Sequence, residues 1–214
     1  LGKFGSMDKI EYALYVVNEG NNRNTFDVNN EPLIGGRLTW NALGAHGFTQ
    51  ADINDTQDMQ LAYGVTGNYN KPGLAANNTM LGTGADMALR YKGFSFVTEG
   101  NYARNNTTKL NVFGGMAQAG YFLVPKRFEV AARGATVMPT AANVVNGYEF
   151  GGCLSYYFIG HNVKLQTDYA MLVNSPLTFG GGATARNFMT TGTNPTFNQN
   201  QNDHRLRTQL QLYF

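Results

Sequence analysis

The chain has 214 residues, of which 43% are hydrophobic and 14% charged, with 26 glycines, 12 tyrosines and a formal net charge of +2. This balance fits one domain, and low charge with abundant glycine and tyrosine favours a β protein. No apolar run approaches the ~20 residues that a spanning helix requires, which excludes a helical membrane protein. The small, scattered net charge argues against nucleic-acid binding, and the single cysteine, Cys153, excludes an internal disulfide.

Ten segments are predicted to be β-strands, because most of them alternate apolar and polar residues with a period of two. In chain order they span 8–18, 33–43, 58–70, 82–92, 94–104, 109–123, 127–138, 147–158, 162–173 and 204–214. In the third segment Leu61 and Tyr63 share one face, whereas Asp58 and Gln60 take the other. The segment 109–123 is apolar on both sides, so its facing stays open. No long segment shows the helical period of 3.6 residues.

The last eleven residues alternate without a break, with Leu210, Leu212 and Phe214 on one face and arginines on the other. The closing strand of an outer-membrane β-barrel has this pattern, because one face meets lipid and the other a watery lumen. The last strand of a soluble sandwich is the alternative. The negative mean hydropathy of −0.30 does not exclude a barrel, since lumen-facing residues offset lipid-facing ones.

Connection lengths alternate along the chain, as they do in barrels with short periplasmic turns and longer external loops. The predicted external connections are 19–32, 71–81, 105–108, 139–146 and 174–203, and the predicted periplasmic ones are 44–57, 92–93, 124–126 and 159–161. Only 44–57 breaks the pattern, because it is long. The longest connection, 174–203, has three consecutive glycines and many Asn and Thr, which predicts an external loop that is either solvated or folded into the pore.

Several motifs resemble one known family. The runs Gly115–Val124 (GMAQAGYFLV) and Lys126–Arg133 (KRFEVAAR) are similar to a segment of the phosphate-selective porin O and P family. The hairpin formed by Gly147–Phe158 (GYEFGGCLSYYF) and His161–Tyr169 (HNVKLQTDY) resembles that family's penultimate hairpin. Its terminal strand is similar to Arg207–Phe214, and one of its mid-chain strands is similar to Lys9–Asn18.

The resemblance implies a trimeric porin channel of about 16 strands in the outer membrane of a Gram-negative bacterium, of which this chain is the C-terminal portion. The expected fold is therefore an all-β, antiparallel up-and-down transmembrane barrel, with residues 1–214 in one domain of a barrel of about 16–18 strands. The implied partners are outer-membrane lipid, small hydrophilic solutes or anions, and the barrel-assembly machinery acting on the terminal strand at Phe214. No cofactor and no metal are expected.

Charged residues on the polar side of each predicted strand are expected to line the lumen. The pore-lining candidates are Lys9, Glu11, Arg37, Asp58, Asp86, Arg90, Lys92, Glu99, Glu129, Arg133, Lys164, Asp168, Arg205 and Arg207, to which Arg127 and Glu149 add one charge of each sign. Cations only slightly outnumber carboxylates, and a nearly balanced wall selects weakly, so at most a weak anion preference is predicted. Pairing of these charges across strands is the alternative.

Aromatic residues near the predicted strand ends are expected to face lipid at the membrane interfaces. They are Tyr12, Trp40, Tyr63, Tyr69, Tyr91, Phe94, Tyr102, Phe128, Tyr148, Phe158, Tyr169 and Phe214. In a soluble protein the same residues would form a core.

Two other function classes stay open. A small ten-stranded structural or adhesive barrel without an open pore fits if the chain is complete, and an outer-membrane barrel hydrolase is the less favoured alternative. For hydrolysis, His204 beside Asp203 is the one histidine placed at an external rim. The cluster of Asp52, Asn54, Asp55 and Asp58 suggests calcium but lacks the EF-hand glycine and glutamate, so an acidic loop is the preferred interpretation.

Overall fold

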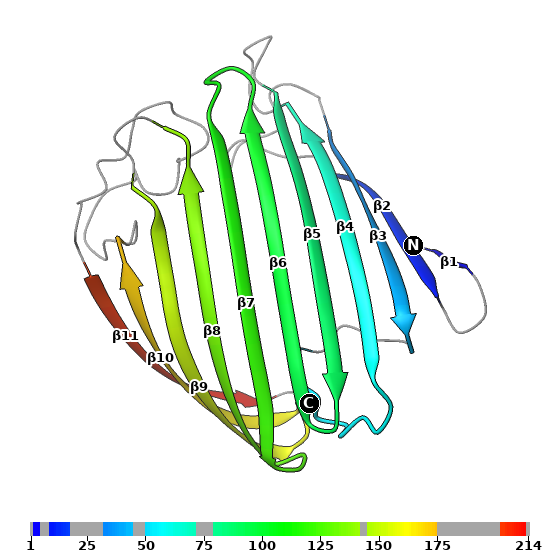
Figure 1. Cartoon of the computed structure of the whole chain (residues 1–214), viewed down its shortest axis with the longest axis vertical. Coiled ribbons are helices and arrows are strands. Elements are labelled where there is room, and N and C mark those ends of the chain that lie inside the picture. Colours follow the sequence, from blue (N-terminus) through cyan, green and yellow to red (C-terminus); the bar gives the residue numbers. More distant parts are fainter. Residues whose placement is uncertain are drawn as a thin grey trace.

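The protein folds as one antiparallel sheet in which each strand pairs with the next strand along the chain. The computed structural model describes residues 2–4, 9–17, 32–44, 50–71, 79–141, 145–174 and 202–212. The strands are β1 (Gly2–Phe4), β2 (Ile10–Val17), β3 (Leu33–Leu43), β4 (Gln60–Asn70), β5 (Met80–Tyr91), β6 (Phe94–Asn105), β7 (Asn111–Val124), β8 (Phe128–Pro139), β9 (Gly147–Ile159), β10 (Val163–Val173) and β11 (Asn202–Leu212). Figure 1 shows them side by side in chain order, with the sharpest bend at β9–β11.

All ten predicted strands are present, with ends displaced by up to about two residues, so the prediction of an all-β, up-and-down antiparallel fold is confirmed. The short strand β1 was not predicted, because three residues are too few to show an alternation. Within the described ranges the sheet is open, since no pairing joins its first and last strands. Those ranges also contain no helix that is long and apolar enough to cross a membrane.

The two ends of the sheet differ in their connections. At one end, which we call the turn end, Lys92–Gly93, residues 125–127 and residues 160–162 join neighbouring strands tightly. Lys92 and Gly93 both have positive φ, 47° and 78°, the conformation of a two-residue hairpin turn whose twist matches that of the strands. The opposite end, the loop end, holds residues 106–110 and the connections that follow β2, β4, β8 and β10. The residues 175–201 of the predicted long loop and Phe214 lie outside the described part of the chain.

Cross-strand register gives the sheet two distinct faces, because directly paired residues point to the same side. One row, for example, joins Thr39, Gly64, Asp86, Glu99 and Met116 across five strands. We call this side the polar face and the other side the apolar face. The register also settles the facing of β7, which the sequence left open: Gln118 and Phe122 lie on the polar face, and Tyr121 lies on the apolar face.

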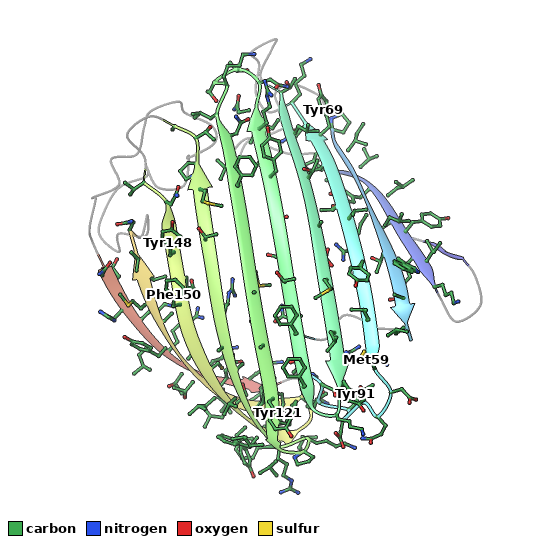
Figure 2. The ribbon with its side chains drawn as sticks, viewed as in Figure 1. Met59, Tyr69, Tyr91, Tyr121, Tyr148 and Phe150 are labelled. Atoms are coloured by element: carbon green, nitrogen blue, oxygen red, sulfur yellow. The ribbon has the colours of Figure 1, made fainter. Side chains whose placement is uncertain are left out.

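The apolar face consists largely of exposed aliphatic and aromatic side chains. Leu14, Val65, Leu154 and Leu206 are exposed by 78%, 53%, 51% and 71%, values that a core residue does not show. The predicted aromatic residues, Phe214 apart, all lie on this face by register, and Tyr69 and Tyr148 lie towards the loop end whereas Tyr91 and Tyr121 lie at the turn end (Figure 2). The sheet therefore presents a wide apolar surface, far larger than a soluble monomer usually exposes.

Candidate functional site

A hollow of about 550 Å³ lies on the polar face of β7–β11. We call it the polar hollow. Its lining includes seven charged residues, one or two from each strand of β8–β11: Glu129, Arg133, Glu149, Lys164, Asp168, Arg205 and Arg207. Glycines and alanines such as Ala131, Gly151 and Ala170 stand between them, so the charged side chains have room to extend across neighbouring strands.

The charges in the polar hollow are arranged as ion pairs between strands. The Arg207 guanidinium of β11 lies 3.1 Å from the Asp168 carboxylate on β10, its direct cross-strand partner. Glu149 on β9 stands between two arginines, with its Oε1 3.5 Å from Arg205 and 3.9 Å from Arg133. Arg207 and Arg133 keep 60% and 47% of their side-chain surface exposed, so these pairs are solvated and each adds little stability.

A second ion pair crosses an intervening strand on β3–β5. Arg37 on β3 donates two hydrogen bonds to the Asp86 carboxylate on β5, of 2.6 and 2.7 Å. The guanidinium passes directly over Gly64 on β4, where an added Cβ would overlap both Arg37 and Asp86. Glycine at this position is therefore what permits the two-pronged contact.

We predict that Gly64→Ala breaks this contact and lowers the free energy of unfolding by at most about 1 kcal/mol, because the groups that must move are the ends of flexible, partly exposed side chains. Gly67→Ala is the matched control, because a Cβ at Gly67 on the same strand meets only the Gly82 carbonyl at 4.0 Å. Urea unfolding of the two purified variants measures the difference. Equal midpoints for both variants would show that Arg37 and Asp86 do not depend on the glycine.

Residues 51–56, part of the connection between β3 and β4, fold onto the polar face at the turn end. Ala51 and Ile53 pack in a buried cluster with Phe122 of β7 and Tyr157 of β9. Gln50 and Ala51 also line the polar hollow, so this segment closes the hollow at the turn end. We call residues 51–56 the plug segment. Its inward position accounts for the length of the connection 44–57, which is the only long one among the predicted periplasmic connections.

Asp52 anchors the plug segment and is only 1% exposed. Its carboxylate accepts hydrogen bonds from the Thr56 amide at 3.0 Å, the Thr56 hydroxyl at 2.5 Å and the Gly93 amide at 2.8 Å. The Thr56 carbonyl in turn accepts a 2.7 Å bond from the Lys92 amide. Asp52 therefore ties the segment both to itself and to the β5–β6 turn, which explains how a carboxylate can be buried here.

The structure shows what engages the acidic residues of the connection 44–57. The Asp52 carboxylate is engaged by backbone and hydroxyl donors, and Asp55 adopts a positive φ of 54° next to the turn. In the described part of the chain no group of three or more His, Cys, Asp or Glu residues is placed to hold a metal ion. The signal that marks the plug segment in the sequence is Ile53, the apolar residue within the otherwise polar run 52–58.

Glu129 and Tyr157 form a buried pair beside the plug segment. The Tyr157 hydroxyl donates a 2.6 Å hydrogen bond to Glu129 Oε2. Tyr157 is 3% exposed and Glu129 is 6% exposed. Next to them, burial and then the charge of Lys164 lower the pKa of His161, which lies in the turn after β9. His161 is therefore neutral at pH 7 and adds no charge to this end of the hollow.

The predicted pore-lining residues largely share one surface. Except for four, all of them lie within strands on the polar face, together with Glu149. The exceptions flank strands: Lys9 precedes β2, Asp58 precedes β4, Arg127 lies in the β7–β8 turn, and Lys92 lies in the β5–β6 turn with its Nζ 5.0 Å from the ring centre of Tyr91. Sequence reasoning missed Asp52 and Tyr157, whose roles depend on contacts between distant segments.

Cys153 lies on the polar face and is half-buried, where its Sγ accepts a 3.2 Å hydrogen bond from Gln166. Asp203 and His204 do not form a catalytic pair with each other, because consecutive strand residues point to opposite faces. His204 is on the apolar face, with its Nδ1 2.6 Å from the Tyr169 hydroxyl. Comparison of the chain with protein-family models, curated proteins and solved structures finds no match.

Proposed function

We propose that this sheet forms part of the wall of an outer-membrane β-barrel porin, a water-filled channel for small hydrophilic solutes and ions. The observation that supports this most strongly is the division into two faces over the whole sheet, with exposed leucines and valines on one side and paired charges around a hollow on the other. A barrel wall needs this division, because its outer face contacts acyl chains and its inner face contacts water.

Strand length and the aromatic residues support the same proposal. Strands β3–β11 have 11–14 residues, enough for the 9–11 residues of a tilted strand that spans the hydrocarbon core. Tyr69 and Tyr148 lie towards the loop end and Tyr91 and Tyr121 at the turn end, the two places where a barrel wall would meet the membrane interfaces (Figure 2). The open edges of the sheet are the places where further strands, as in the expected barrel of about 16–18, would pair.

The proposed channel has at most a weak anion preference. Arg37, Arg207 and the pair Arg133 and Arg205 each lie against a carboxylate, so the wall presents alternating charge instead of rings of one sign. Such a wall leaves only a small residual potential in the lumen. Trimer formation and insertion by the barrel-assembly machinery belong to this proposal as partners that the family resemblance implies.

Reversal potentials across planar bilayers containing the full-length protein test the proposal. We predict ion-conducting channels with a chloride-to-potassium permeability ratio between about 1 and 3, as an almost balanced wall implies. Arg207→Gln should lower this ratio, because it leaves the Asp168 charge without its partner. Absence of channels would reject the proposed porin function. Clear potassium selectivity of the wild type would reject the predicted weak anion preference.

A structural or adhesive barrel without an open pore is the second candidate. The buried cluster of Ala51, Ile53, Phe122 and Tyr157 favours it, because this cluster closes the hollow at the turn end. The mass of the protein taken from its native membrane separates the two candidates. About 23 kDa supports a narrow barrel filled by side chains, whereas a substantially larger mass supports a porin wall with more strands.

A further inference from the structure

Two lysines stand on neighbouring turns at the turn end. Lys92 lies in the β5–β6 turn and Lys126 in the β7–β8 turn, and both side chains are exposed. The turns are adjacent, because β6 pairs with β7 through Phe94 and Tyr121, and the Phe122 amide donates a 3.0 Å hydrogen bond to the Gly93 carbonyl. Two turns that each carry an exposed lysine are thus neighbours at one rim of the sheet.

The apolar face next to these lysines is rich in exposed aromatic and aliphatic side chains. Tyr91, Phe94, Tyr121 and Leu123 are exposed by 37%, 38%, 48% and 56%. The Lys92 ammonium lies 5.0 Å from the ring centre of Tyr91, so its charge sits over the aromatic surface (Figure 2 labels Tyr91 and Tyr121). A cation at the edge of an aromatic band matches the depth at which lipid phosphates lie next to a membrane protein.

The backbone is left-handed at both lysines. Lys92 and Lys126 have φ values of 47° and 63°, a conformation that glycine or asparagine adopts at lower cost and that costs other residues about 1–2 kcal/mol. Two carboxylates adjoin the first turn: Asp52, which accepts a 2.8 Å hydrogen bond from the Gly93 amide, and Asp55, whose Oδ1 lies 3.9 Å from a Cβ built at Gly93. Within the part of the chain that the structure describes, neither lysine forms an ion pair, so both ammonium groups are available to a ligand.

We propose that Lys92 and Lys126 bind the phosphate of an anionic phospholipid in the leaflet at the turn end, with the acyl chains lying on Tyr91, Phe94, Tyr121 and Leu123. This inference rests on the proposed function, since it requires the apolar face to contact a bilayer. The ligand is a lipid and not a free phosphate, because the cations adjoin an extended apolar surface that an inorganic ion leaves uncovered.

Native mass spectrometry of the full-length protein tests this inference in micelles that contain equal amounts of phosphatidylglycerol and phosphatidylcholine. We expect the wild type to retain phosphatidylglycerol over phosphatidylcholine by at least about threefold, as electrostatic attraction to juxtamembrane lysines implies. The double variant Lys92→Gln with Lys126→Gln should bring the ratio near one. Lys109→Gln is the matched control, because Lys109 is exposed and has a φ of 58° but lies in the turn at the loop end.

A wild-type ratio of one, or an unchanged ratio in the double variant, overturns the lipid site. A similar loss in Lys109→Gln also overturns it, since the preference then follows total charge instead of place. Retention of inorganic phosphate added alone, at the same lysines and without lipid preference, shows a phosphate site instead. The channel measurements on the wild type test the proposed function separately. A negative result in the lipid experiment therefore does not count against the proposed function, and the lipid result can be interpreted without the channel data.

Discussion

Asp52→Ala should open the proposed channel at the turn end and raise its single-channel conductance. The substitution removes the acceptor for the Thr56 and Gly93 amides, so the plug segment keeps only the backbone hydrogen bond from Lys92 to Thr56 as a tie to the β5–β6 turn. Hydrogen bonds to a charged group contribute about 1.5–3 kcal/mol each, which exceeds what Ile53 alone can restore by packing on Phe122. We therefore expect the segment to leave the polar face while the strands stay paired.

Planar-bilayer recordings measure the conductance of Asp52→Ala beside that of Asp58→Ala. Asp58 belongs to the same connection but is exposed, so its loss should change the conductance little. Far-ultraviolet circular dichroism checks that both variants keep their strands. A folded Asp52→Ala variant with wild-type conductance would show that the plug segment does not narrow the conducting path.

The strands were predictable from the sequence because the two-residue period records the environment of each side chain. In β10, Leu165 and Tyr169 alternate with Lys164 and Asp168, and the observed register places them on opposite faces. The turns were predictable for a similar local reason, since Lys92–Gly93 separates two alternating runs by two residues. Most predicted pore-lining residues share one face because, once one residue of a strand is assigned to the correct face, the alternation assigns all the others in that strand.

The plug segment and the particular partners in the ion pairs were not predictable from local patterns, although pairing of charges across strands was one of the two expectations. The hydrogen bond from Gly93 to Asp52 joins residues 41 positions apart, and Arg37 reaches Asp86 only because Gly64 leaves space between them. Both contacts depend on how the sheet curves, which an alternation does not record. The sequence also cannot fix barrel closure, since each strand pattern is the same in an open and a closed sheet.

Leu154→Arg should strongly destabilise the protein in a bilayer. Leu154 lies near the middle of β9 on the apolar face, opposite Val130 and Thr167, and is already 51% exposed in the isolated sheet. An arginine at the mid-plane of a lipid-facing barrel strand costs about 2–4 kcal/mol, whereas the cost falls to about 0–1 kcal/mol near an interface. Phe158→Arg is therefore the matched variant, because Phe158 is on the same face of the same strand but close to the turn end.

Urea unfolding of both variants in phosphatidylcholine vesicles separates a membrane wall from a water-exposed sheet. In water both positions are more than half exposed, at 51% and 58%, and substitutions at such surface sites change stability by only about 0.5 kcal/mol. Only in a bilayer do the two positions differ, because there the free-energy cost of an arginine depends on its depth in the membrane and not on its exposed fraction alone. A loss of several kcal/mol at Leu154 with a small loss at Phe158 is thus the result that the proposed wall requires, and equal small losses would place the apolar face outside the hydrocarbon.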